Sequence, residues 1–138
     1  MKSFLCVLFL SVIMIACSEK SPDCGDPGSS NCELVLKDAQ NNLLVGTIYN
    51  QDSIRMQVGN QQIPLHFDHG IIIFNFAGFD SLNSSDYVLK LNNDDFDTLN
   101  LKIRKYVNPC WTGYLLDSLS YNNQVLDKIT MNRYEIVK

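Results

Sequence analysis

The chain has 138 residues and a formal net charge of −4, with 11 lysines and arginines against 15 acidic residues. This acidic balance, without a long basic stripe, argues against nucleic acid and anionic lipid surfaces as partners. Twelve of the acids are Asp and three are Glu. Because Asp favours turns and Glu favours helices, the composition favours a fold of strands and turns.

The first seventeen residues have the pattern of an export signal. Lys2 is followed by an apolar run, residues 4–15, which only Ser11 interrupts, and then by Ala16 and Cys17. A charged start, a short apolar run and a small residue are typical of a secretory signal. The run is too short for a membrane-spanning helix, which needs about 20 apolar residues. An ordinary secreted protein and an uncleaved anchor are the alternatives to a lipoprotein.

The cysteine that ends this signal resembles the lipobox of bacterial lipoproteins. In that family the signal is cut before the cysteine, which is then acylated, for example with palmitate. The resemblance implies a signal peptide over residues 1–16, lipidation of Cys17 and a lipid anchor in the bacterial cell envelope. We expect the outer membrane, with the periplasmic and the surface face both open. Met14 departs from the family pattern, in which Leu is commoner at that position.

The residues after the signal divide into a tether and one domain. Residues 17–31 are rich in Pro, Gly, Ser and Asp and nearly lack apolar side chains, a composition typical of a flexible linker. Residues 32–138 are enough for one domain.

Three cysteines remain once Cys6 leaves with the signal and Cys17 carries lipid. The bacterial envelope permits disulfides, so we expect one bridge. It would join Cys32 to Cys110, with Cys24–Cys110 and Cys24–Cys32 as the alternatives that sequence alone leaves open. The spacing matches no zinc motif.

From residue 32 onwards, short apolar segments alternate with turns rich in Asn, Asp and Gly. Pro64 predicts that its segment is a sheet edge or a bulge. The segment 111–119 also fits a helical period, although we favour a strand. About nine strands at this spacing predict an all-β fold, an antiparallel β-sandwich, Ig-like or similar, with a small β-barrel as the alternative. These strands are expected within ten apolar segments, which are 34–36, 43–49, 53–58, 63–67, 71–76, 87–91, 96–107, 113–121, 124–127 and 134–137.

Two clusters of side chains could carry chemistry. His66, Asp68 and His69 could bind zinc, but we favour the interpretation that they form a surface strand end beside a turn. The acidic segment 92–97 lacks the Gly and the Glu of a calcium loop, so we interpret it as a hairpin turn. The sequence contains no Gly-x-Ser-x-Gly elbow and no Gly-rich phosphate loop. We therefore expect no catalytic residues, no metal and no cofactor.

Trp111 and Tyr114 are the candidate ligand-facing aromatic residues. Exposed rings on a sandwich could stack on sugars or anchor a protein partner. In a small β domain such rings also commonly belong to the core.

Asp followed by Ser or Thr and then an aliphatic residue occurs four times, placing Ser53, Ser81, Thr98 and Ser118 in this pattern. The pattern resembles the acceptor motif of the O-glycosylation system of Bacteroidota, which implies that these hydroxyls carry glycans. The structural alternative is that Asp ends a turn, Ser or Thr begins a strand, and the aliphatic residue faces the core.

The lipobox, the segment 97–101, Cys110 and the segment 121–123 together resemble the small uncharacterised lipoproteins of Bacteroidota. That resemblance implies a β-sandwich-like domain on the cell envelope and transfers no active-site residue. We expect a non-catalytic binding or adaptor module with an envelope protein as partner. A glycan-binding accessory lipoprotein that uses Trp111 and Tyr114 is the first alternative. A metal-dependent enzyme that uses His66, Asp68 and His69 is the second.

Overall fold

The computed structural model describes residues 28–77 and 86–138. The predicted signal peptide, Cys17, Cys24 and Ser81 lie outside these residues. The described residues form eleven strands and one short 3-10 helix, η1 (Gln51–Ser53). The strands are β1 (Asn31–Lys37), β2 (Arg55–Val58), β3 (Gln61–Ile63), β4 (His66–Asp68), β5 (Ile71–Asn75), β6 (Asp86–Lys90), β7 (Phe96–Val107), β8 (Thr112–Tyr121), β9 (Gln124–Val125), β10 (Lys128–Thr130) and β11 (Arg133–Val137).

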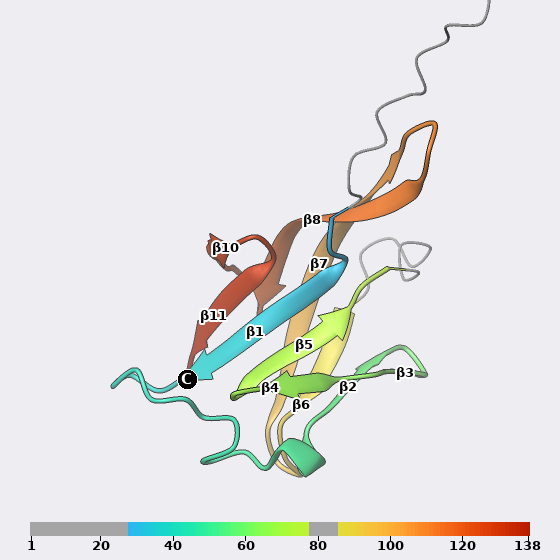
Figure 1. Cartoon of the computed structure of the whole chain (residues 1–138). Coiled ribbons are helices and arrows are strands. Elements are labelled where there is room, and N and C mark those ends of the chain that lie inside the picture. The colour runs from blue at the N-terminus through green and yellow to red at the C-terminus, as the bar shows by residue number, and fades with distance from the viewer. Residues whose placement is uncertain (1–27, 78–85) are drawn as a thin grey trace, which may run out of the picture.

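The strands form two sheets, which confirms the predicted β-sandwich. One sheet has the order β10-β11-β1-β5-β4 and the other has the order β3-β2-β6-β7-β8-β9. All described pairings are antiparallel except that of β1 with β11. Figure 1 shows the two sheets as separate layers, so they do not close into the barrel that was the alternative.

The core lies between the two sheets because each strand alternates buried and exposed side chains. In β2 and β6 every second residue is buried, and β7 follows the same pattern up to Leu101. The largest fully buried side chains come from both layers: Tyr134 and Phe74 from the five-stranded sheet, and Tyr87 from the six-stranded sheet. Burial of such rings is the main driving force for packing one sheet on the other.

Pro64 lies where the chain changes sheets. The strand β3, which ends just before it, is an edge strand of one sheet, and β4, which begins two residues later, is an edge strand of the other. Proline has no amide hydrogen to donate to a neighbouring strand. Pro64 therefore lies between two edge strands, in line with the predicted edge, but the single strand expected at 63–67 is wrong because the chain passes from one sheet to the other there.

The structure also decides the predictions for the segments 43–49 and 111–119. The strand expected at 43–49 is wrong: Leu44 and Tyr49 are buried, but the chain turns back at Gly46, which has φ +87°. The amide of Gly46 donates to the carbonyl of Tyr49 at 2.8 Å, and the amide of Ile48 donates to the carbonyl of Leu44 at 2.9 Å.

The segment 111–119 is extended and mostly belongs to β8, so the helical alternative is wrong. Within the described ranges, no helix is long and apolar enough to cross a bilayer.

Candidate functional site

The histidine cluster that was the alternative zinc site lies on the surface of an edge strand. His66 and Asp68 are exposed residues of β4, and His69 occupies the following turn with φ 47°. The Nδ1 atom of His69 is 2.5 Å from Oδ1 of Asp68, and the imidazole is almost fully exposed. Among the residues that the structure describes, no group of three or more His, Cys, Asp or Glu side chains is placed to hold a metal ion.

The acidic segment 92–97 forms a hairpin turn, as interpreted from the sequence. The side-chain oxygen Oδ1 of Asn92 accepts hydrogen bonds from the amides of Asp94 and Asp95 at 2.8 and 2.9 Å. This is the Asx arrangement that favours Asn in turns. The turn brings Asp95 and Asp97 to one end of the sandwich.

Both carboxylates there face one lysine from the other sheet. Lys138 follows β11, and its Nζ lies 2.7 and 2.9 Å from the two oxygens of Asp95 and 2.7 Å from Oδ2 of Asp97. The hydroxyl of Tyr49 donates to Asp95 at 2.5 Å. The amide of the Asn122 side chain donates to Oδ1 of Asp97 at 2.9 Å. These five residues are called the Lys138 cluster below.

Hydrogen bonds within the Lys138 cluster favour the charged forms of Lys138 and Asp95. Burial opposes the charged form of Lys138, but the hydrogen bonds to Asp95 and Asp97 outweigh it and raise the lysine pKa above its usual 10.5. Burial likewise opposes the charge of Asp95, but the hydrogen bonds from Lys138 and Tyr49 lower its pKa below 3.8. Because every carboxylate oxygen of the cluster has a donor, the cluster ties the two sheets together and presents no free base or nucleophile.

Sequence reasoning did not find this cluster. Its members are separated by up to 89 positions, from Tyr49 to Lys138. Only the acidic segment 92–97 was recognisable in the sequence. It was compared with a calcium-binding loop, and no lysine partner was considered.

The cysteines differ from the favoured prediction. Cys32 is a free cysteine and is fully buried, so the expected Cys32–Cys110 bridge and the alternative Cys24–Cys32 bridge are both wrong. Burial raises the pKa of the Cys32 thiol, with a smaller contribution from Glu33, and the thiol therefore stays protonated and unreactive. Cys110 is disulfide-bonded, and its partner is not among the described residues.

Trp111 and Tyr114 do not form one platform. The ring of Trp111 covers Gly113, where an added Cβ would lie 2.5 Å from a ring carbon, and packs on Tyr106 with ring centroids 5.3 Å apart. Successive residues of a strand point to opposite faces, so Tyr114 points away from the face that Trp111 covers. Tyr114 is half-buried against the core cluster. The two rings predicted to share a ligand therefore lie on opposite faces of a hairpin.

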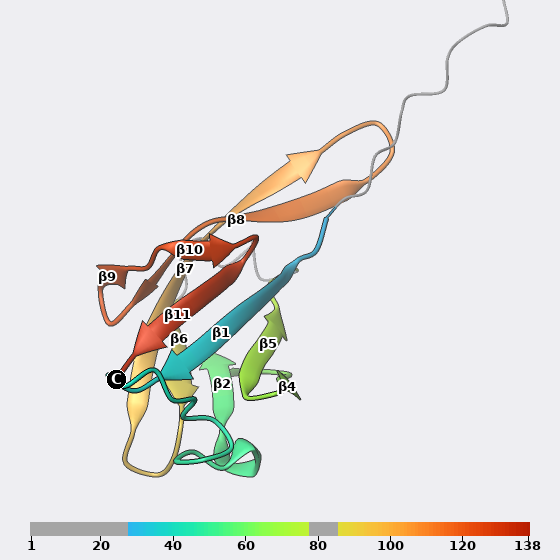
Figure 2. The same ribbon diagram turned by 60° about the vertical axis from the view of Figure 1, so that its left-hand side comes forward.

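That hairpin forms an arm, defined here as residues 102–118, whose base packs on the core through Ile103, Tyr114 and Leu116 and whose far end projects from the sandwich (Figure 1). The strand β7 pairs with β6 only from Phe96 to Asn100 and continues beyond that point paired only with β8. The register shifts between Lys102 and Ile103, and such a bulge bends and twists a hairpin. Figures 1 and 2 both show the arm leaving the body of the molecule.

The structural alternative for the repeated Asp-Ser/Thr-aliphatic pattern holds only in part: the aliphatic residues face the core, but Asp97 and Asp117 lie inside β7 and β8 rather than at the end of a turn. The aliphatic residues Ile54, Leu99 and Leu119 are all buried. The hydroxyl of Ser53 lies 2.7 Å from the carbonyl oxygen of Asn50 and 3.0 Å from that of Leu91, whereas Thr98 is exposed. Glycosylation of these hydroxyls, and of Ser118 and Ser81, stays a prediction.

Comparisons with models of protein families, with curated proteins and with solved structures find no match for this chain. The functional argument therefore depends on the chain's own residues.

Proposed function

We propose that this chain is a non-catalytic binding module, held at the bacterial envelope by a lipid on Cys17, which contacts an envelope protein through the arm. The observation that carries the proposal is the arm itself. Two-stranded hairpins are marginally stable alone; the base of the arm packs on the core through Ile103, Tyr114 and Leu116, but its far end exposes side chains that do not contribute to the core. A protein-contact surface is the role that its side chains support.

The exposed side chains of the arm are apolar and basic. Tyr106, Val107 and Leu115 are all more than two-fifths exposed. The arm holds three cations, Lys102, Arg104 and Lys105, against one acid, Asp117, although the chain as a whole is acidic. Aromatic residues and arginine are enriched at protein interfaces, and charge complementarity steers association. The partner that fits is a protein with an acidic rim around an apolar patch.

Cys110 supports the arm at its free end. It follows Asn108, whose Oδ1 accepts hydrogen bonds from the amides of Cys110 and Trp111, each at 2.9 Å. By elimination among the remaining cysteines of the mature chain, Cys24 in the tether is the partner that we propose for Cys110. That bridge would join the arm to the segment next to the lipid.

Photo-crosslinking tests the arm. With p-benzoylphenylalanine in place of Leu115, we expect a discrete crosslinked protein in intact cells of the source bacterium. Lys105→Glu should abolish this crosslink because it reverses a charge at the interface. The control places the same probe at Ile48, which is 71% exposed but lies outside the arm. The same product from both positions, or a product that survives Lys105→Glu, would contradict the proposal.

The anchor has a separate test. Several acyl chains hold a protein stably at a membrane, so the full chain should partition into the detergent phase of a cloud-point separation. Cys17→Ala should move most of the protein to the aqueous phase. Cys32→Ala is the matched control because Cys32 lies in the core and should not change the partition. Equal partition of wild type and Cys17→Ala would overturn the lipid anchor.

A further inference from the structure

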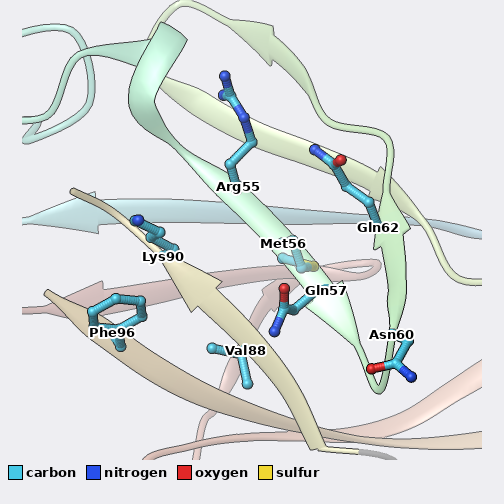
Figure 3. Close-up of a pocket in the computed structure, with 8 residues that line it drawn as sticks. All are labelled: Arg55, Met56, Gln57, Asn60, Gln62, Val88, Lys90 and Phe96. Carbon is cyan, nitrogen blue, oxygen red and sulfur yellow. The ribbon is translucent and has the colours of Figure 1, made fainter. Parts of the chain in front are cut away.

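A shallow groove of about 380 Å³ lies on the outer face of the six-stranded sheet. It is lined mainly by Arg55, Gln57, Gln62, Val88, Lys90 and Phe96. Figure 3 shows these side chains on strands β2, β3 and β6 and at the start of β7. The volume is at the lower end of the range typical of small-molecule sites. This surface is called the Arg55 groove below.

The strand registers set the side chains of the groove in two rows. In the first row, Arg55 lies directly opposite Lys90, and Lys90 lies directly opposite Phe96. In the second row, Gln62 lies opposite Gln57, and Gln57 lies opposite Val88. Directly opposite residues of antiparallel strands share one face, with Cβ atoms about 5 Å apart. The groove therefore has a charged row beside a row that two amides dominate.

The charged row places two cations side by side without an acid. Neither Arg55 nor Lys90 forms an ion pair with any residue of the described ranges. Nη1 of Arg55 donates to the carbonyl of Ile54 at 2.7 Å, and Nζ of Lys90 lies 5.3 Å from the centroid of the Phe96 ring. Like charges directly opposite each other destabilise a sheet. A bound anion would offset this cost.

We propose that the Arg55 groove binds an acidic saccharide. Its carboxylate or sulfate group would lie between Arg55 and Lys90. There it would form charge-assisted hydrogen bonds, which are stronger than those between neutral groups. One sugar ring would stack on Phe96, which is 56% exposed, since aromatic faces pack well on apolar C–H surfaces. The amides of Gln57 and Gln62 supply both donors and acceptors for the sugar hydroxyls.

An acidic peptide fits the same groove less well. Extended peptides bind sheets mainly by adding a strand at a free edge, where main-chain groups are unpaired. The Arg55 groove lies on the face of the sheet, and its charged row is on β2, β6 and β7, each of which is paired on both sides; only β3, which contributes Gln62, has a free edge. A peptide there would have to rely on side chains alone. This site does not depend on the protein partner proposed for the arm.

Calorimetric titration of the full chain, purified in detergent at low salt, tests the proposal. The probes are oligogalacturonate for carboxylates, a heparin-derived hexasaccharide for sulfates, cellohexaose as the neutral sugar and hexaglutamate as the acidic peptide. We expect one of the two acidic saccharides to bind, and the stronger of the two identifies the anionic group. Cellohexaose and hexaglutamate should bind at least tenfold more weakly.

Variants then locate the site. Arg55→Gln and Lys90→Gln should each weaken binding about tenfold or more, as expected for loss of a charge-assisted hydrogen bond, and Phe96→Ala should weaken it several-fold. Lys105→Gln, a cation of the arm, should not change it. Arg55→Gln should unfold at the same temperature as wild type or higher, because it removes a like-charge pair, so lost binding cannot come from unfolding.

Three outcomes would overturn the proposal. They are no binding of either acidic saccharide, equal loss in Lys105→Gln and Arg55→Gln, and hexaglutamate binding that is as tight as the saccharide and depends on Arg55. The last outcome would assign the groove to an acidic peptide.

Discussion

Replacing Lys138 by Ala is expected to lower the free energy of unfolding by about 2 kcal/mol, because its partly buried ion pairs fall between exposed pairs, which contribute about 0–1 kcal/mol, and buried pairs, whose loss costs about 3–5 kcal/mol. The variant leaves Asp95 and the buried Asp97 as two adjacent carboxylates without their shared cation. It also removes the ammonium group that lies 5.5 Å from the centroid of the Tyr49 ring. Urea unfolding followed by circular dichroism measures the change as a shift of the midpoint at constant slope.

An exposed ion pair provides the control for Lys138→Ala. Arg104 pairs with Asp117 on the arm at 3.2 Å, and both side chains are largely exposed. Exposed pairs contribute about 0–1 kcal/mol, so Arg104→Ala should scarcely move the midpoint. If the two variants cost the same, the Lys138 cluster does not tie the sheets together.

The pH dependence of stability follows from the same cluster. The pKa of Asp95 is lower in the folded state, so its contribution is present above pH 3.8 and is lost as the pH falls below that value. The pKa of Lys138 is raised, so its contribution is present below pH 10.5 and is lost as the pH rises through the folded-state pKa. The stability of wild type should fall at both ends of this range, and Lys138→Ala should reduce both falls.

Local patterns in the sequence predicted the fold well. Alternation in residues 54–58 and 87–91 indicated which side chains enter the core, and Pro64 marked the end of an edge strand. The strand predicted for residues 43–49 was wrong because their apolar side chains are buried although the segment forms no strand. Burial needs only that Leu44 and Tyr49 point inward, and the turn at Gly46 achieves this.

The candidate sites were harder to predict because they depend on pairing between distant strands. Arg55 and Lys90 are 35 positions apart and become neighbours only because β2 pairs with β6 across the intervening β3, β4 and β5. No periodicity encodes that pairing. Trp111 and Tyr114 were predicted to face one ligand, but the turn between Val107 and Thr112 folds the indole back over Gly113, which separates the two rings.

Loss of the Cys110 disulfide is the other large effect that we expect. Cys24→Ser and Cys110→Ser should each lower the free energy of unfolding by about 2–4 kcal/mol, the usual contribution of a disulfide that closes a long loop. The two cysteines are 86 positions apart. The double variant should lose no more than either single variant, because both changes break the same bond. Urea unfolding with and without dithiothreitol measures the loss, and mass spectrometry of non-reduced peptides identifies the pair.

Cys32→Ser distinguishes the disulfide from packing. Because Cys32 is free and buried, its variant should still become less stable on reduction, whereas Cys24→Ser and Cys110→Ser should not respond to dithiothreitol. Additive losses in the double variant would show that Cys24 and Cys110 are not partners. If they are partners, only six residues separate Cys17, which carries the lipid, from Cys24 in the bridge, and these seven chain steps reach about 25 Å when fully extended. The end of the arm would then stay near the membrane, so the protein that it contacts would have to lie close to the same lipid surface.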